Sequence, residues 1–243
     1  SVSGDIIKKR DMKLTVSANM AHNANKLVSL HGTYRGEELT TSEWVTLASA
    51  SGSGLTSNTG VTYMGEGYPV GIFRLPVADG FKQDDNGHNL FVLKDLNGDG
   101  KVDQSNTGDR EILGQVIPKV TGNLSIQFQY KNFDISTQMT GAFGHKIYNF
   151  TSMCLHDLSG FPMYNVLQEA IKDNIYGLSH TSYYLENGDY VNIAYITLGY
   201  NLPASITRNS LIKGLRVALS CNNVATITGY TGLTPMINSA SIS

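Results

Sequence analysis

Apolar and polar residues alternate through the stretch GNLSIQFQYKNFDISTQMTGAFG, residues 122–144. Alternation of this kind is typical of β-strands that present one apolar and one polar face. A two-residue turn at Lys131 and Asn132 would place Tyr130 opposite Phe133, and this register puts the apolar residues of both strands on the same face. The stretch therefore predicts an antiparallel hairpin with one apolar side.

Three further stretches show the same period of two. They read KLTVSANM from Lys13, DYVNIAYITLGYNLP from Asp189 and GLRVALSCNN from Gly214. The second changes phase near Ala194 and Tyr195, where a β-bulge would restore the alternation. With the hairpin, these patterns predict five strands, near residues 12–21, 122–131, 133–142, 189–201 and 214–226.

The connections between the predicted strands alternate between long and short. Residues 22–121 and 143–188 form long loops, whereas the turns near 131–132 and 203–214 are short. Transmembrane β-barrels of the outer membrane combine short periplasmic turns with long extracellular loops in this way. A soluble β-sandwich stays open as the alternative, because alternation alone does not separate a core face from a lipid face.

Composition narrows the possibilities further. The chain has 243 residues, a formal net charge of -2 and only 16% charged residues, so no global basic field indicates a nucleic-acid partner. No uninterrupted apolar run reaches 18 residues, which excludes a transmembrane helix but not a transmembrane barrel. The two cysteines lack metal-type spacing. The abrupt start at SVSGDIIKKRD leads us to expect a piece of a longer protein.

The acidic segment DLNGDGKVD, residues 95–103, has the spacing of an EF-hand calcium loop. Such loops place oxygen ligands at alternate positions and a glycine at the sixth. Asp95, Asn97, Asp99 and the backbone carbonyl of Lys101 occupy ligand positions here. Position twelve departs from the pattern, because Asn106 stands where a carboxylate is expected. The alternative is a solvated Asp/Asn/Gly turn without an ion.

Catalytic motifs are not evident. The six histidines, residues 22, 31, 88, 145, 156 and 180, show no zinc-binding spacing and are expected at surface or rim positions. Aromatic residues of the first long loop have two interpretations, namely ordinary packing or contacts with sugar rings or with a partner protein. They are Trp44, Tyr63, Tyr68, Phe73 and Phe81. We therefore expect a protein that is not an enzyme.

Three segments together resemble one protein family. DLNGDGKVD with the hairpin after it, YYLENGDYVNIAYITLGYNLP, and GLRVALSCNNVATITGYTGLTP occur in the order found late in the barrel of SusC/RagA-type TonB-dependent outer-membrane transporters. In that family an acid precedes an arginine at the end of the acidic loop. Here QSNTGDR looks like a short insertion that moves this acid to Asp109, and Asp103 would act through a water molecule. The resemblance thus implies a structural Ca²⁺ held with Asp109 as the last ligand.

The resemblance also implies the architecture and the partners. The fold would be all-β, the C-terminal part of a 22-stranded antiparallel transmembrane barrel with long extracellular loops, and neither the plug nor the last strand would be present in this sequence. The function would be TonB-dependent import of oligosaccharides or oligopeptides across the outer membrane of a Gram-negative, Bacteroidetes-type cell. The partners would be a SusD-like lipoprotein, the TonB-ExbB-ExbD complex and outer-membrane lipid. The rival function is a soluble, calcium-stabilised, β-rich glycan-binding or adhesion module.

Overall fold

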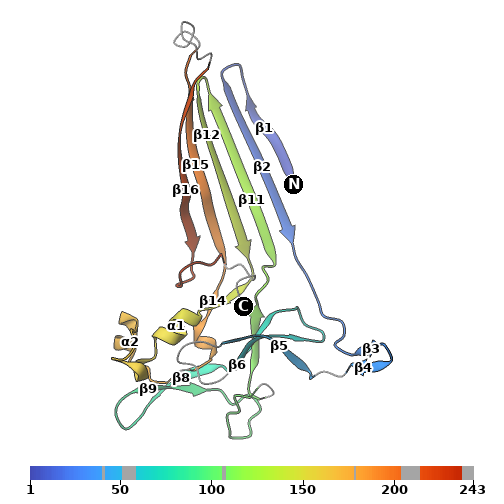
Figure 1. Ribbon diagram of the computed structural model, residues 1–243, viewed down its shortest axis with the longest axis vertical. Coiled ribbons are helices and arrows are strands. Elements are labelled where there is room, and N and C mark those ends of the chain that lie inside the picture. The colour runs from blue at the N-terminus through green and yellow to red at the C-terminus, as the bar shows by residue number, and fades with distance from the viewer. Residues whose placement is uncertain (40–41, 51–58, 106–107, 178, 204–213, 237–243) are drawn as a thin grey trace. The chain divides into compact units, whose positions relative to one another are not determined.

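The computed structural model describes residues 1–39, 42–50, 59–105, 108–177, 179–203 and 214–236. The chain divides into two compact units (Figure 1). Unit 1 comprises residues 1–23, 118–144 and 189–229, and unit 2 comprises residues 24–117, 145–188 and 230–243.

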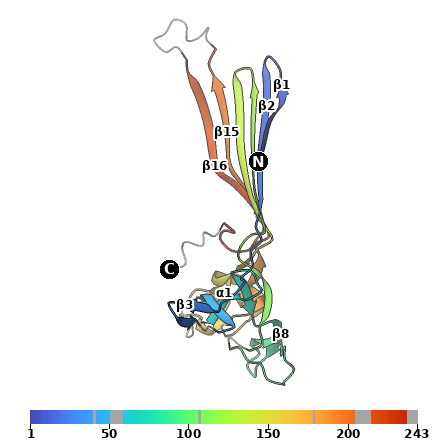
Figure 2. The same cartoon turned by 90° about the vertical axis from the view of Figure 1, so that its right-hand side faces the viewer.

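Unit 1 is one antiparallel sheet of six long strands. Its strands are β1 (Val2–Lys8), β2 (Met12–His22), β11 (Val120–Tyr130), β12 (Phe133–Phe143), β15 (Tyr190–Asn201) and β16 (Arg216–Thr228). Their order in the sheet is β1-β2-β11-β12-β15-β16, so β1 and β16 are the edges (Figure 2). Five of these strands lie where the alternation predicts them.

The predicted hairpin and its register are confirmed. Strand β11 pairs with β12 without interruption, and Tyr130 lies opposite Phe133. Lys131 begins the two-residue turn with a φ of 52°, a conformation shared by the turn types whose twist matches that of the flanking strands. The alternating sequence therefore specifies both the pairing and the face on which each side chain lies.

The predicted bulge is also confirmed. The pairing of β15 with both of its neighbours shifts between Ile193 and Tyr195. Opposite β12, Ala194 is the extra residue, whereas opposite β16 the two residues Asn223 and Val224 face Ala194. The bulge keeps Ile193 and Ile196 on the same side of the sheet, as the phase change in the sequence requires.

Strand β1 was not predicted from the sequence. It pairs with β2 over Val2–Lys8, but the register shifts between Asp5 and Ile7. The adjacent apolar residues Ile6 and Ile7 interrupt the alternation at that point, so the pattern alone does not show a strand.

The two long connections form unit 2, which is folded and not a set of irregular loops. A four-stranded sheet has the order β10-β7-β6-β5, and three two-stranded ribbons pair β13 with β14, β3 with β4, and β8 with β9. These strands are β3 (Gly32–Tyr34), β4 (Glu37–Leu39), β5 (Trp44–Ala50), β6 (Thr59–Gly65), β7 (Ile72–Leu75), β8 (Ala78–Gln83), β9 (Asn89–Leu93), β10 (Glu111–Gln115), β13 (Lys146–Tyr148) and β14 (Leu185–Asn187).

Helices are few and short, so the fold is all-β. They are α1 (Phe150–Leu155), α2 (Gln168–Asp173) and the 3₁₀ turns η1 (Leu158–Gly160) and η2 (Ser182–Tyr184). Among the described residues, no helix has both the length and the apolar character needed to cross a membrane.

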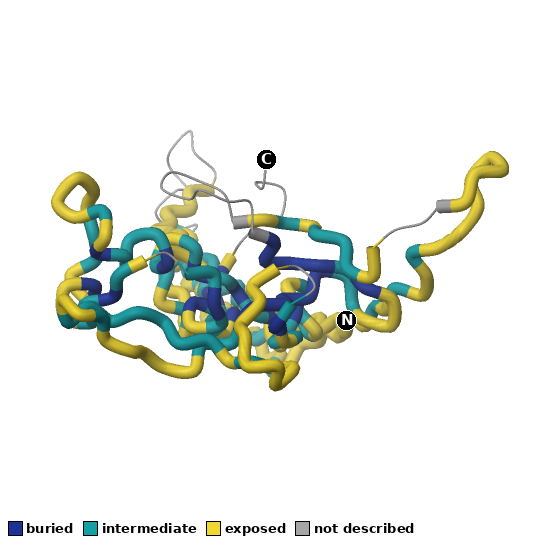
Figure 3. The backbone as a smooth tube through the Cα atoms, turned by 90° about the horizontal axis from the view of Figure 1, so that it is seen from below, coloured by how far each residue is buried: buried dark blue, intermediate teal, exposed yellow. Residues whose placement is uncertain are grey.

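The apolar core belongs to unit 2. Val61, Phe73 and Leu75 pack together on strands β6 and β7, and partly buried residues such as Leu113 and Tyr148 cover them. Figure 3 shows buried segments in dark blue and exposed segments in yellow. Among the described residues of unit 1, only Ala142, Asn192 and Gly199 are buried to this degree. The long sheet therefore has no core of its own.

The strand ends of unit 1 differ in what they connect. At one end, Lys131 and Asn132 join β11 to β12, and the turn Lys9–Asp11 joins β1 to β2; we call this the turn end. At the other end, His22 pairs with Val120, and the connections that make up unit 2 begin there. Most of the predicted turn near 203–214 lies outside the described residues.

Candidate functional site

The two faces of the long sheet have opposite chemistry. Neighbouring strands align their apolar residues in rows across the sheet. One such row contains Leu14, Phe128, Ile135, Leu198 and Leu219. The residues next along each strand point to the other face and are mostly Ser, Thr, Asn and Gln. The register thus separates one apolar face from one polar face.

No other described part of unit 1 covers the apolar face. Leu219 is 76% exposed and Met20 is 77% exposed, although both lie in regular strands. A soluble β-sandwich would cover such a face with a second sheet, and the described residues of unit 1 contain only one sheet. Side chains of this size are normally removed from water, so the face is suited to an apolar environment outside the chain.

The polar face is joined by side-chain hydrogen bonds between strands. The amide of Asn123 donates to Asn19 at 2.9 Å, and that of Asn192 donates to Thr226 at 2.8 Å. The hydroxyls of Thr197 and Ser220 are 2.7 Å apart. These pairs are uncharged donors and acceptors, which suit a wet surface and interact with polar solutes by hydrogen bonding.

Charges on the polar face lie close to the turn end. Lys13 pairs with Asp5 at 3.3 Å, and Nε of Arg216 donates to Asp134 at 3.2 Å. A hollow of about 320 Å³ lies beside Lys13 and Asp134, and Gln127 contributes to its wall. The charged and uncharged parts of this face are therefore separate along the strands.

The acidic segment forms a tight loop in unit 2. Both carboxylate oxygens of Asp95 accept backbone N–H groups, from Gly98 at 2.7 Å and from Gly100 at 2.8 Å. Asn97 accepts the N–H of Asp99, and Asp99 accepts the N–H of Lys101, each at 2.8 Å. The alternating polar residues thus fold the loop around their own side chains.

Asp109 reaches back to this loop. Its carboxylate accepts the N–H groups of Leu96 at 2.9 Å, Asn97 at 3.2 Å and Asp103 at 2.9 Å, and the residue is only 2% exposed. These backbone donors, that of Asp103 first, lower the pKa of the Asp109 carboxyl group below its ordinary value. Asp109 therefore closes the loop from its far end.

The fit of this loop to a calcium ion depends on oxygen atoms other than carboxylates. Among the described residues, no three His, Cys, Asp or Glu side chains gather closely enough to hold a metal ion. The ligand set would need the Asn97 side chain and the Lys101 carbonyl besides Asp95, Asp99 and Asp109. A carboxylate that accepts an N–H keeps further lone pairs for an ion. The calcium site stays a prediction. Asn106, which stands at position twelve of the loop pattern, lies outside the described residues.

Arg110, the next residue, is a central group that sequence reasoning missed. Its guanidinium donates to Tyr63 Oη at 2.8 Å and to the carbonyl groups of Gly60, Arg74, Gln104 and Ser105 at 2.8–3.2 Å. The residue is 7% exposed, and burial lowers its pKa. It stays protonated because guanidinium pKa values are so high. Arg110 thus joins the acidic loop to strands β6 and β7.

Two histidines contradict the expectation of surface positions. His145 is 7% exposed and His156 is 6% exposed, and Nε2 of His156 lies 2.9 Å from a carboxylate oxygen of Asp173. His156 follows α1 and Asp173 ends α2, so this contact links the two short helices. The position of an isolated histidine in the sequence does not show whether tertiary packing will bury its side chain.

The aromatic residues of the first long connection divide into two groups. Tyr63 is fully buried and Phe73 is 3% exposed, so both pack in the core. The rings of Trp44 and Tyr68 are tilted against each other, with their centroids 5.2 Å apart. Tyr68 and Phe81 are 40% and 42% exposed. Packing in the core explains Tyr63 and Phe73. For the exposed rings of Tyr68 and Phe81, ordinary packing and contact with sugar rings or a partner protein both stay as interpretations.

Comparison with known proteins gives relatives over nearly the whole chain. TonB-dependent receptor P3 of Formosa agariphila is 27% identical over 259 residues, which cover 98% of this chain and 24% of the receptor. The chain resembles TonB-dependent transporters of the SusC/RagA type. TonB-dependent receptor P26 of the same organism is 25% identical and covers 54% of this chain and 14% of the receptor. No known family model matches the sequence.

The solved structure of the RagAB peptide importer in its closed-closed state has the same fold. It matches with a TM-score of 0.71 and 19% identity over 96% of this chain and 26% of the RagAB chain. A second structure, of the RagAB peptide transporter, matches with a TM-score of 0.67 and 20% identity. The chain thus resembles TonB-dependent receptors in sequence and the RagAB transporter in fold. The chain spans about a quarter of the length of the proteins that it matches.

Proposed function

We propose that the chain forms part of the wall and the outer loops of a 22-stranded transmembrane β-barrel in a TonB-dependent importer. The supporting observation is the long sheet with one bare apolar face and one hydrogen-bonded polar face. Strands β2, β11 and β12 each have 11 residues, and a tilted strand needs about 9–11 residues to cross the bilayer. In this proposal the apolar face contacts outer-membrane lipid and the polar face lines the interior.

The cargo would be an oligosaccharide or an oligopeptide. The polar face offers neutral donors and acceptors over most of its length, and both cargo classes are rich in groups that hydrogen-bond to such side chains. Energy would come from the TonB-ExbB-ExbD complex through parts of the protein beyond this sequence. A SusD-like lipoprotein would close the barrel from outside, by analogy with the RagAB peptide importer. The location would be the outer membrane of a Bacteroidetes-type cell.

Unit 2 would then be extracellular, because its connections leave the sheet at the end opposite the short turns. The acidic loop belongs to the same proposal as a structural calcium site. Asp95, Asn97, Asp99, the Lys101 carbonyl and Asp109 would hold the ion, with Asp103 acting through water, and the ion would stabilise the loop. A divalent cation would offset the repulsion among these carboxylates, and no catalytic step is assigned to it.

Extraction of the full-length protein tests the barrel against the soluble alternative. We expect it to leave the membrane fraction only in detergent and to run as a compact band on SDS gels until it is heated. A freely soluble, monodisperse protein without detergent would instead support the glycan-binding or adhesion module.

Limited proteolysis tests the calcium site. Calcium should protect the 95–109 loop of the wild-type protein, and Asp99→Ala should remove that protection. Asp85→Ala, in a different exposed turn, is the matched control and should keep it. Equal protection of all three proteins, or none in the wild type, would contradict a calcium site here.

A further inference from the structure

The turn end of the long sheet carries an excess of positive charge. We define the turn rim as residues 5–13, 129–134, 199–203 and 214–217. Its basic residues are Lys8, Lys9, Arg10, Lys13, Lys131 and Arg216, and its acidic residues are Asp5, Asp11 and Asp134. Six positive against three negative side chains give the rim a net charge of +3, although the whole chain has -2.

Internal ion pairs do not neutralise this excess. Lys13 is paired with Asp5, and Arg216 is paired with Asp134. Four cations then stand against the single carboxylate of Asp11. Within the described part of the chain, these cations have no carboxylate oxygen within 4.0 Å. They are Lys8, Lys9, Arg10 and Lys131, and all four are exposed.

Backbone hydrogen bonds hold these cations together. The N–H of Lys9 donates to the carbonyl of Met12 at 2.8 Å and closes the first turn. The N–H of Lys131 donates to the carbonyl of Asp11 at 2.7 Å, which joins the second turn to the first. The positive charges are therefore gathered on one ordered edge.

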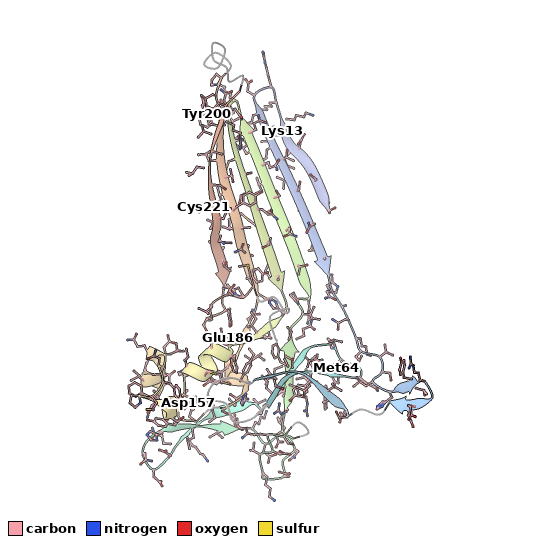
Figure 4. All side chains as sticks on the ribbon, in the orientation of Figure 1. Lys13, Met64, Asp157, Glu186, Tyr200 and Cys221 are labelled. Carbon is pink, nitrogen blue, oxygen red and sulfur yellow. The ribbon has the colours of Figure 1, made fainter. Side chains whose placement is uncertain are left out.

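An aromatic row lies directly beside them at the limit of the apolar face. Phe133 and Tyr200 pair across strands with their ring centroids 4.6 Å apart. Nζ of Lys131 lies 5.4 Å from the centroid of the Tyr130 ring. Figure 4 shows Tyr200 and Lys13 at this end of the strands. From the middle of the sheet towards the turn rim, the side chains are thus first aliphatic, then aromatic and finally cationic.

This order matches the order of a lipid leaflet from chains to headgroups. Aromatic rings concentrate at the membrane–water interface, and lysine side chains extend over apolar surface to place their amines in the polar layer. Phosphate groups of anionic lipids attract clustered Lys and Arg. We propose that the turn rim binds the headgroups of anionic phospholipids in the leaflet that the turn end reaches, an inference that rests on the proposed membrane-embedded barrel.

Lipid retention by the full-length protein tests this proposal. The detergent-solubilised protein is mixed with micelles that contain phosphatidylglycerol or phosphatidylcholine, and bound lipid is quantified. The test variant combines Lys8→Gln, Lys9→Gln and Arg10→Gln. The control combines Lys26→Gln, Lys82→Gln and Lys172→Gln, which remove the same charge from exposed positions of unit 2.

We expect the rim variant to lose at least about tenfold in affinity for phosphatidylglycerol, since each cation near an anionic surface contributes about fivefold. Its affinity for phosphatidylcholine, and both affinities of the control, should change less than about twofold. Equal losses in both variants, or no loss in the rim variant, would overturn the proposal. Displacement of phosphatidylglycerol by millimolar inorganic phosphate would also overturn it, because a simple anion site would then suffice.

Insertion of the wild-type protein into phosphatidylcholine bilayers separates the two proposals. Failure to insert would count against the barrel itself. Insertion without any preference for phosphatidylglycerol would leave the barrel standing and reject only the lipid-binding rim.

Discussion

An arginine at the middle of the apolar face should destabilise the protein far more than an arginine one residue away. Ile126 lies six residues from one end of β11 and four from the other, and its side chain belongs to the apolar face. Its neighbour Gln127 belongs to the polar face. The pair Ile126→Arg and Gln127→Arg therefore changes charge and size at the same depth but on opposite sides.

The strand length sets the expected magnitude. Eleven residues at about 3.3 Å each extend about 36 Å, and a tilt of about 40° reduces this to about 28 Å along the membrane normal. Ile126 then lies near the middle of the apolar band. Arginine at the midplane of such a barrel costs about 2–4 kcal/mol, and near the interface about 0–1 kcal/mol. We expect the first range for Ile126→Arg and less than about 1 kcal/mol for Gln127→Arg.

The assay follows the folded fraction of the full-length protein in phospholipid vesicles during urea unfolding, with band shifts on SDS gels as a second readout. Val120→Arg, at the end of the same strand and face, is the depth control and should cost much less than Ile126→Arg. Equal costs for Ile126→Arg and Gln127→Arg would refute the assignment of the faces. Equal costs for Ile126→Arg and Val120→Arg would refute a lipid environment and favour a soluble core.

Two further predictions concern unit 2. Arg110→Lys keeps the charge but cannot reproduce five hydrogen bonds, so it should destabilise unit 2 by about 3 kcal/mol, measured as earlier thermal unfolding and faster cleavage near the 95–109 loop. The Asp109 carboxyl group has a lowered pKa in the folded protein. Its contribution to stability is therefore present above the unfolded pKa of about 3.9, and it is lost as the pH falls through the lower pKa of the folded state. Proteolytic protection of the loop should therefore persist at pH 5 and disappear only in strong acid. Asp109→Asn should lose most of it already at pH 7, and unchanged protection in that variant would contradict the role of its carboxylate.

The alternating sequence determined the long strands. Successive side chains of a strand point to opposite faces, so an apolar–polar alternation assigns each side chain to one face. It specified the Lys131–Asn132 hairpin, its register and the bulge at Ala194, and the resemblance to TonB-dependent transporters followed from local motifs. Strand β1 was not predicted, because Ile6 and Ile7 interrupt the alternation at a bulge. The acidic loop was evident from spacing, and the contact of Asp109 with it was expected from resemblance.

Only the tertiary structure decided which polar groups become buried. Three of the five hydrogen bonds of the Arg110 guanidinium are made to residues 36–50 positions away in sequence. The contact between His156 and Asp173 likewise links two separate short helices. The core of unit 2 likewise joins β6 and β7 with Tyr148, Phe150 and Leu185, which lie more than 70 positions later. Such contacts depend on how distant segments pack, and a local pattern of residue types does not encode that packing. By contrast, the two faces of the sheet follow from strand geometry alone, which is why they could be predicted.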